Sequence, residues 1–123
     1  MDLTILIPTR IETEDRLRNI ISSVSYLLKN VPAKIMVKEV SDQNTFKFRA
    51  LPEIKKYADT VHLTHLYEES NDPLFCKSKV LNDMIVAADT NVVANYDADC
   101  ILPIEAYRQA YNAIQDNQLD VVY

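Results

Sequence analysis

The sequence contains no glycine, although a globular chain of 123 residues ordinarily has about eight. Every glycine-rich phosphate loop is therefore excluded, both the G-x-G-x-x-G turn and the Walker A loop. Backbone positions that need a positive φ are expected to fall to Asn or Asp, which tolerate this region best after glycine. A phosphorylated ligand would then have to be screened by a metal ion or by a local cation.

Cysteine, basic charge and long apolar runs are also scarce. Cys76 and Cys100 are too few for a disulfide framework, and we expect both to be free thiols in a reducing, cytosolic setting. Basic residues number 13 against 18 acidic ones, and the net charge of −5 argues against a nucleic-acid partner. No apolar run approaches the roughly 20 residues that span a bilayer, and no basic signal-peptide segment opens the chain. The composition predicts one globular domain over residues 1–123 without a transmembrane segment.

Strand-like and helix-like patterns alternate along the chain. Short apolar and β-branched runs predict strands at 3–8, 34–40, 61–67, 91–96 and 119–123. Apolar residues with helical spacing predict helices at 13–30, 51–59 and 75–88, and another that starts at Pro103. This order predicts an α/β fold with a mainly parallel sheet and helices on both faces. Ligands bind such sheets outside the carboxyl ends of the strands.

Two carboxylates, those of Asp97 and Asp99, follow the strand predicted at 91–96. Like charges this close are unfavourable unless a cation or a proton separates them. Mg²⁺ and Mn²⁺ take oxygen ligands from one or two carboxylates and complete their shell with phosphate oxygens and water. The pair therefore predicts a divalent metal ion that holds a diphosphate. Because D-x-D strings are common, a solvated acidic turn stays open as the alternative.

Four segments, taken in order, resemble the motifs of family 2 glycosyltransferases. They are the strand 3–10 ending Ile-Pro-Thr-Arg, the strand 35–39 ending in an acidic residue, the helix start 77–82, and the segment 92–103 with its D-x-D and following proline. The resemblance covers nearly all of the chain. It implies the GT-A fold, which is the Rossmann-like fold of nucleotide-diphospho-sugar transferases. By this resemblance the chain corresponds to the nucleotide-sugar-binding half of such a transferase domain.

The resemblance also implies a role for each matching residue at the rim of the sheet. Thr9, Arg10 and Glu12 are expected beside the nucleotide, and Glu39 at its base or ribose. Lys77 is expected at the diphosphate. Asp97 is expected to bind ribose or sugar hydroxyls or the metal, and Asp99 to be the more direct metal ligand.

Plainer interpretations stay open for three of these residues. Arg10 is alternatively the partner of a surface carboxylate, a contact of little energetic value. Glu39 is alternatively a solvated strand end, and Lys77 an exposed lysine at a helix start.

The activity that the resemblance implies is transfer of a sugar from a UDP- or GDP-type donor to a hydroxyl of a saccharide or lipid acceptor. Family members are far longer, and their second half binds the acceptor and supplies the catalytic base. Here the chain stops inside the strand predicted at 119–123, so the acceptor half is expected to be absent and the catalytic base is unknown. We expect the chain to be the donor-binding part of the enzyme and to be inactive alone. We expect it in the cytosol, or at the inner face of a membrane to which the missing acceptor half would attach it. A truncated sheet would expose an edge and favour self-association into homo-oligomers.

Two other functions compete with this interpretation. A sugar-phosphate nucleotidyltransferase would carry a glycine-rich loop after its first strand, and residues 8–12 contain none. A non-catalytic α/β binding or regulatory module remains open, because the second half of a transferase is lacking.

Overall fold

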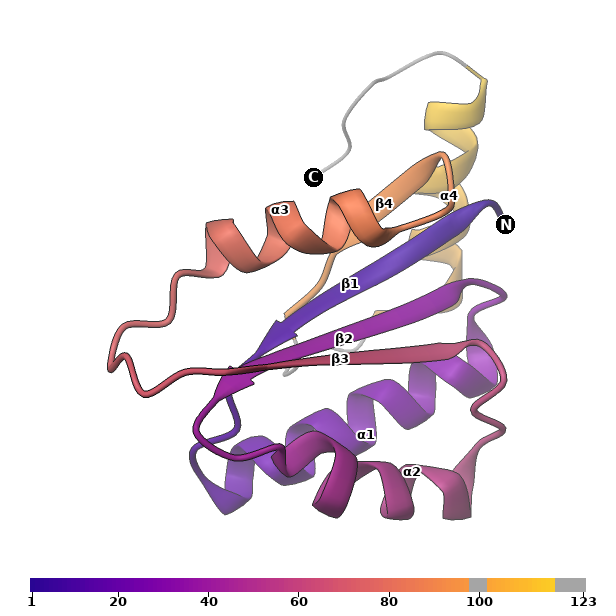
Figure 1. Cartoon of the computed structure of the whole chain (residues 1–123). Helices are drawn as coiled ribbons and strands as arrows, with labels where there is room; N and C mark the ends of the chain where they lie inside the picture. Colours follow the sequence, from indigo (N-terminus) through magenta and orange to yellow (C-terminus); the bar gives the residue numbers. More distant parts are fainter. Residues whose placement is uncertain (98–101, 117–123) are drawn as a thin grey trace.

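The computed structural model of the chain describes residues 1–97 and 102–116, which form a parallel sheet covered by helices (Figure 1). Its four described strands have the order β3-β2-β1-β4. The strands are β1 (Leu3–Thr9), β2 (Lys34–Ser41), β3 (Leu63–Glu69) and β4 (Val92–Asn95). The helices are α1 (Glu14–Asn30), the π-helix η1 (Phe46–Ala50), α2 (Leu51–Tyr57), α3 (Lys77–Ala87) and α4 (Ile104–Gln115). All strand pairs are parallel, so the predicted α/β fold with a parallel sheet is confirmed.

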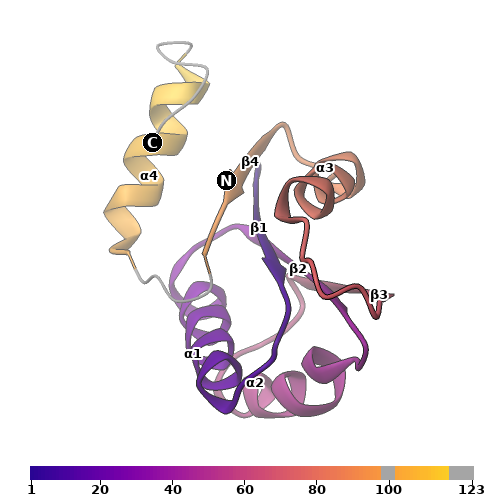
Figure 2. The same cartoon turned by 90° about the vertical axis from the view of Figure 1, so that its left-hand side faces the viewer.

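Helices cover both faces of the sheet, as the sequence predicts. Figure 2 shows α1 and α2 on one face and α3 on the other. Because side chains alternate along a strand, β1 sends Ile5 and Ile7 toward α1 and Leu6 toward α3. The larger core cluster therefore lies on the α1 side, and the smaller one on the α3 side consists of Leu6, Met36, Val40, Val80 and Met84.

Local signals set the ends of α1. The side chain of Thr13 accepts a hydrogen bond from the backbone N–H of Arg16 at 3.1 Å, which caps the first turn. Glu14 and Asp15 then stand at the positive end of the helix dipole. The helix stops just before Pro32, which cannot continue it. Because α1 directly follows β1, its first turn lies at the carboxyl end of that strand.

A buried carboxylate holds the start of the helix at Phe46, in the segment 46–50 for which the sequence predicts no element. Glu39 lies opposite Thr9 of β1 and Tyr67 of β3. Its side chain is 0% exposed and accepts a hydrogen bond from the backbone N–H of Phe46 at 2.8 Å. Burial raises the pKa of Glu39, and the hydrogen bond from Phe46 offsets this only in part. The solvated strand end considered for Glu39 is therefore wrong.

Two other elements differ from the expected pattern. Strand β3 begins two residues later than predicted, because Val61 lies exposed in a turn and only the carbonyl of His62 reaches the backbone N–H of Ile35. On α3 the helical spacing of apolar residues predicts that Ile85 is buried with Val80 and Met84, but Ile85 is exposed and only the other two are buried. The strand predicted at 119–123 lies outside the described residues.

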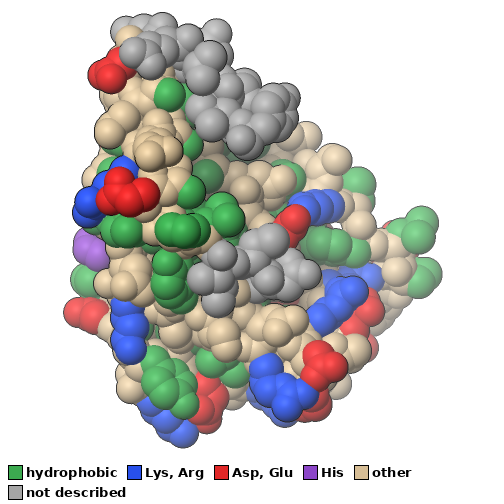
Figure 3. Space-filling model, turned by 180° about the vertical axis from the view of Figure 1, so that it is seen from behind, with side chains coloured by type: hydrophobic (Ala, Val, Ile, Leu, Met, Phe, Trp, Pro, Cys, Tyr) green, Lys and Arg blue, Asp and Glu red, His purple; other side chains and the backbone are tan. Residues whose placement is uncertain are grey.

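The described sheet ends at β4, and α4 packs beside it (Figure 2). The hydroxyl of Tyr26 on α1 donates to the carbonyl of Leu102 at 2.8 Å, and the ring of Tyr107 lies 6.2 Å from that of Tyr96. Seen from behind, hydrophobic side chains gather near α4 (Figure 3). Self-association through this region stays a prediction.

Among the described residues, no helix combines the length and apolarity that crossing a membrane requires.

Two valine-to-alanine changes in helices test the position of the core. Val24 in α1 is 0% exposed, whereas Val86 in α3 is 87% exposed. Val24→Ala should lower the free energy of unfolding by about 2 kcal/mol, because it removes two buried methyl groups and leaves a cavity. Val86→Ala makes the same chemical change and should leave the unfolding free energy nearly unchanged. Urea unfolding followed by circular dichroism measures both, and equal effects would contradict the assignment of the two faces.

The buried carboxylate of Glu39 predicts a specific pH dependence of stability. A carboxyl whose pKa is higher in the folded state binds its proton more tightly there, so stability falls as pH rises through this pKa. Relative to Glu39→Gln, which cannot ionise, the wild type should lose unfolding free energy as the pH rises from the ordinary glutamate pKa of 4.5 through the raised pKa of the folded state. Glu69→Gln, at an exposed position of β3, serves as the control. Urea unfolding at several pH values would refute this if the difference between wild type and Glu39→Gln stayed constant.

Candidate functional site

The carboxyl ends of the strands carry two depressions that meet at Arg10. We call the first, of about 400 Å³, the cationic depression; its lining residues are Pro8, Thr9, Arg10, Arg16, Asn19, Phe75, Lys77 and Asp97. We call the second, of about 420 Å³, the polar depression; its lining residues are Arg10, Ile11, Glu12, Ser41, Asp42, Gln43, Thr45 and 70–73. Both lie at the edge of the sheet where ligands of parallel α/β folds bind.

Arg10 forms the wall between the two depressions. Its side chain is only 8% exposed and donates from Nε to the carbonyl of Val40 at 2.8 Å and from Nη1 to the carbonyl of Asp72 at 2.7 Å. The guanidinium carbon lies 5.5 Å from the ring centre of Phe75. Arg10 thus ties the end of β1 to the end of β2 and to the loop before α3.

Among the described residues, no acidic side chain forms an ion pair with Arg10. Its acceptors among these residues are backbone carbonyls. Arg10 is 8% exposed, which does not fit the surface position considered for it. Its Nη2 atom is buried and has no hydrogen-bond partner among the described residues. A buried donor without an acceptor is costly, so a ligand oxygen that reached Nη2 would remove this cost.

Two further cations, on two different helices, line the cationic depression. Arg16 projects from the first turn of α1 and donates from Nη1 to the carbonyl of Arg10 at 3.4 Å. Lys77 is the first residue of α3, whose N-terminal end carries a partial positive charge. Against these three cations the described lining contains one carboxylate, that of Asp97. A chain with a net charge of −5 therefore has a locally positive hollow, which attracts anions.

Lys77 and Asp97 lie together, although 20 residues separate them in the sequence. The Lys77 Nζ atom is 2.5 Å from Asp97 Oδ1, and the two side chains are 43% and 60% exposed. The backbone N–H of Tyr96 donates to the carbonyl of Leu6 at 3.0 Å, which continues the pairing of β4 with β1 and carries Asp97 to this edge. The plainer interpretation of Lys77 is an exposed lysine at a helix start. In the structure Lys77 does start α3, but its side chain is half-buried and pairs with Asp97.

The remaining predicted residues are divided between the two depressions and the interior. Thr9 is nearly buried and lines the cationic depression, whereas the exposed Glu12 lines the polar one. Glu39 lines neither, because its side chain lies in the core next to Phe46; its contact with a base or ribose stays a prediction. Asp99 lies outside the described residues. The rim therefore brings together Thr9, Arg10, Lys77 and Asp97, as the sequence predicts, with Glu12 on the other side of Arg10.

Sequence reasoning overlooked three lining residues, Arg16, Asn19 and Phe75. Arg16 and Asn19 are three residues apart in α1 and share one face of the helix. A cue was present, since a basic residue in the first turn of a helix that follows β1 stands near the carboxyl edge of the sheet. Phe75 has no comparable signal, because its position depends on the loop that Arg10 holds.

Asp97 is the described residue of the predicted metal site. Within residues 1–97 and 102–116, no group of three or more His, Cys, Asp or Glu side chains could hold a metal ion. Mg²⁺ and Mn²⁺ are commonly held by one or two carboxylates together with phosphate oxygens and water. The exposed carboxylate of Asp97, in a hollow lined by cations, fits one ligand of a metal that arrives with a diphosphate. It does not fit a metal that the described residues hold by themselves.

Comparisons with known proteins support the fold. No protein-family model matches the chain, and a search of curated proteins gives no match either. Among solved structures, it resembles a protein from Desulfovibrio desulfuricans G20 that has been proposed to be a nucleotide-diphospho-sugar transferase. The TM-score is 0.54 and the sequence identity 16%, over 93% of this chain and 55% of that one. The protein Rv1636 from Mycobacterium tuberculosis H37Rv also matches, with a TM-score of 0.45 and 11% identity over 98% of this chain and 92% of that one.

At 16% identity, the likeness to the first structure supports a shared fold but no shared activity or site. The TM-score of the second structure is too low to support either. The chain spans about half the length of the first protein. It therefore shares the parallel α/β fold of that protein, with a positive hollow at the carboxyl edge of its described sheet.

Proposed function

We propose that the cationic depression binds the diphosphate of a nucleotide sugar, and that the chain is the donor-binding part of a glycosyltransferase of the family 2 type. The observation that carries this proposal is the gathering of three cations at the carboxyl edge of the sheet, in a chain that is acidic overall. Without glycine, the chain has no glycine-rich loop to wrap phosphates, so side-chain cations are the available donors.

Each cation contributes in a different way to diphosphate binding. Arg10 is held rigidly by two backbone carbonyls, so its positive charge is already fixed beside the depression and needs little ordering when a phosphate approaches. Lys77 supplies a mobile point charge from the start of α3, and Arg16 supplies a third positive charge from α1. Thr9 adds polar atoms at the floor of the same hollow.

The polar depression is the proposed place of the nucleoside. Arg10 borders both hollows, so a ligand whose phosphates contact Arg10 can extend its base or ribose toward Glu12. Carboxylate, amide and hydroxyl groups line this depression and suit the hydrogen-bonding edges of a base or ribose. Glu39 contributes by holding the backbone of Phe46, and with it the segment that forms one wall. Both UDP- and GDP-type donors remain candidates.

We propose Mn²⁺ or Mg²⁺ as the metal, with Asp97 and Asp99 as its protein ligands. Such an ion, when bound, would stabilise the negative charge that develops on the leaving diphosphate. The protein's own groups bind and orient the donor phosphates beside it. The acceptor, a saccharide or a lipid hydroxyl, and the catalytic base belong to a part of the enzyme beyond the donor half, so the chain should bind its donor without turning it over.

A non-catalytic binding module is the second candidate, and it would use the same cationic depression. It differs in one measurable respect, because binding of a phosphorylated ligand would then not depend on a divalent metal. The metal dependence of nucleotide affinity therefore separates the two functions.

Arg16 offers a test of the proposed site, since it is exposed and its loss should not disturb the fold. In the presence of Mn²⁺ the wild type should bind UDP or GDP, and Arg16→Gln should weaken binding about tenfold through the loss of one cation facing the diphosphate. Arg18→Gln is the matched control, because Arg18 is two residues further on the same helix, pairs with Asp15 and lines neither depression. Isothermal titration calorimetry measures all three. Equal affinities for Arg16→Gln and Arg18→Gln, or no binding by the wild type, would overturn the proposed function.

A further inference from the structure

The two residues expected to serve the diphosphate and the metal are paired with each other. Lys77 Nζ lies 2.5 Å from Asp97 Oδ1, although one residue starts α3 and the other follows β4. Both line the cationic depression. The ammonium therefore occupies a carboxylate oxygen that a divalent cation would use.

The surrounding charges oppose a metal that arrives alone. A divalent cation approaching Asp97 meets the ammonium of Lys77, and the guanidinium groups of Arg10 and Arg16 line the same hollow. A diphosphate reverses this balance, because its negative charges attract the cations and supply further oxygen ligands to the metal. Lys77 and Asp97 are 43% and 60% exposed, so water screens their ion pair and opening it costs little.

We propose that Lys77 and Asp97 form an exchange pair that makes metal binding depend on the diphosphate. When the diphosphate enters, the Lys77 ammonium moves from Asp97 to a phosphate oxygen, and the freed Asp97 carboxylate binds the divalent cation. The inference rests on the proposed function and adds an order to it: the metal alone binds weakly, and metal and nucleotide strengthen each other's binding. This coupling is reciprocal, since each ligand opens the pair for the other.

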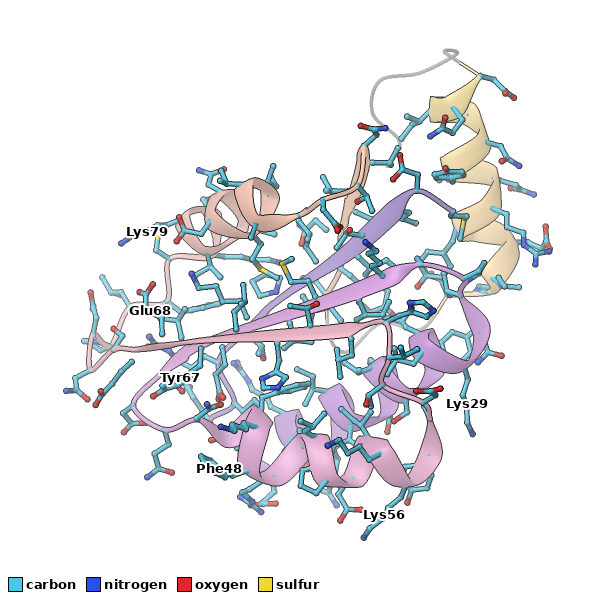
Figure 4. The ribbon with its side chains drawn as sticks, turned by 45° about the vertical axis from the view of Figure 1, so that its right-hand side comes forward. Lys29, Phe48, Lys56, Tyr67, Glu68 and Lys79 are labelled. Carbon is cyan, nitrogen blue, oxygen red and sulfur yellow. The ribbon has the colours of Figure 1, made fainter. Side chains whose placement is uncertain are left out.

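The first measurement uses Mn²⁺ without nucleotide. Lys77→Met keeps a long side chain but removes the ammonium, so Asp97 becomes free and the affinity for Mn²⁺ should rise about fivefold. Lys79→Met is the matched control, because Lys79 lies two residues further on α3, projects outward (Figure 4) and lines none of the described depressions. The double variant Lys77→Met/Asp97→Asn should lose the gain. Electron paramagnetic resonance of free Mn²⁺ gives the affinities.

The second measurement is the affinity for UDP and GDP with and without Mn²⁺. In the wild type Mn²⁺ should tighten nucleotide binding, and in Lys77→Met the tightening should be smaller by about the same fivefold factor. Unchanged Mn²⁺ affinity in Lys77→Met, or equal tightening in both proteins, would overturn the exchange pair even if nucleotides bind. A wild type that binds neither nucleotide, beside a Lys77→Met that binds Mn²⁺ more tightly, would overturn the proposed function and still support the masking of Asp97 by Lys77.

Discussion

Parallel pairing of β1 with β2 on one side and β4 on the other is the constraint on which the rim depends. The pairing sets Thr9 beside Glu39, and the hydrogen bond from Tyr96 to Leu6 extends β4 just far enough to bring Asp97 to the same edge. Because all strands run in one direction, the helices that follow them also begin near this edge. Arg16 in the first turn of α1 and Lys77 at the start of α3 therefore line the same hollow at the end of β1.

A chain without glycine must bring phosphates to side chains rather than to a closely approaching backbone. In the proposed function the buried guanidinium of Arg10 takes the place of such a loop; it binds two carbonyls and keeps its third nitrogen without a partner among the described residues. The arrangement has a structural cost, because a buried cation without a counter-charge is unfavourable. Such a cost is typical of sites where an anionic ligand completes the network, and it connects the packing of the rim to its proposed function.

The fold could be predicted from the sequence because its signals are local. The largely apolar segment 3–8 predicts its strand, and the apolar stripe of 13–30 predicts its helix, without information from elsewhere in the chain. The π-helix at Phe46 could not be predicted in this way, because it depends on a hydrogen bond to Glu39 on a neighbouring strand. Periodicity also could not place the start of β3, where exposed residues continue the same alternation.

The membership of the candidate site was predictable to a similar extent. Strand ends in a parallel sheet share one edge, so Thr9, Arg10 and Asp97 could be placed at the rim from their order alone. What these residues bind within the protein could not be predicted, since the carbonyl of Asp72 and the ammonium of Lys77 reach them from 62 and 20 residues away. The D-x-D pattern suggests two free carboxylates, but the contact with Lys77 shows that one of them already has a partner.

The most direct test of the central claim, that the cationic depression binds a diphosphate, is a titration of ¹⁵N-labelled protein with inorganic pyrophosphate followed by backbone amide resonances. Pyrophosphate carries the diphosphate charge and no base, so it reports on this hollow alone. The account predicts the largest shifts at Thr9, Arg16 and Lys77, which line it. Shifts concentrated at Lys34, His62 and Asp89, at the hollow on the opposite edge of the sheet, or no shifts at all, would contradict it.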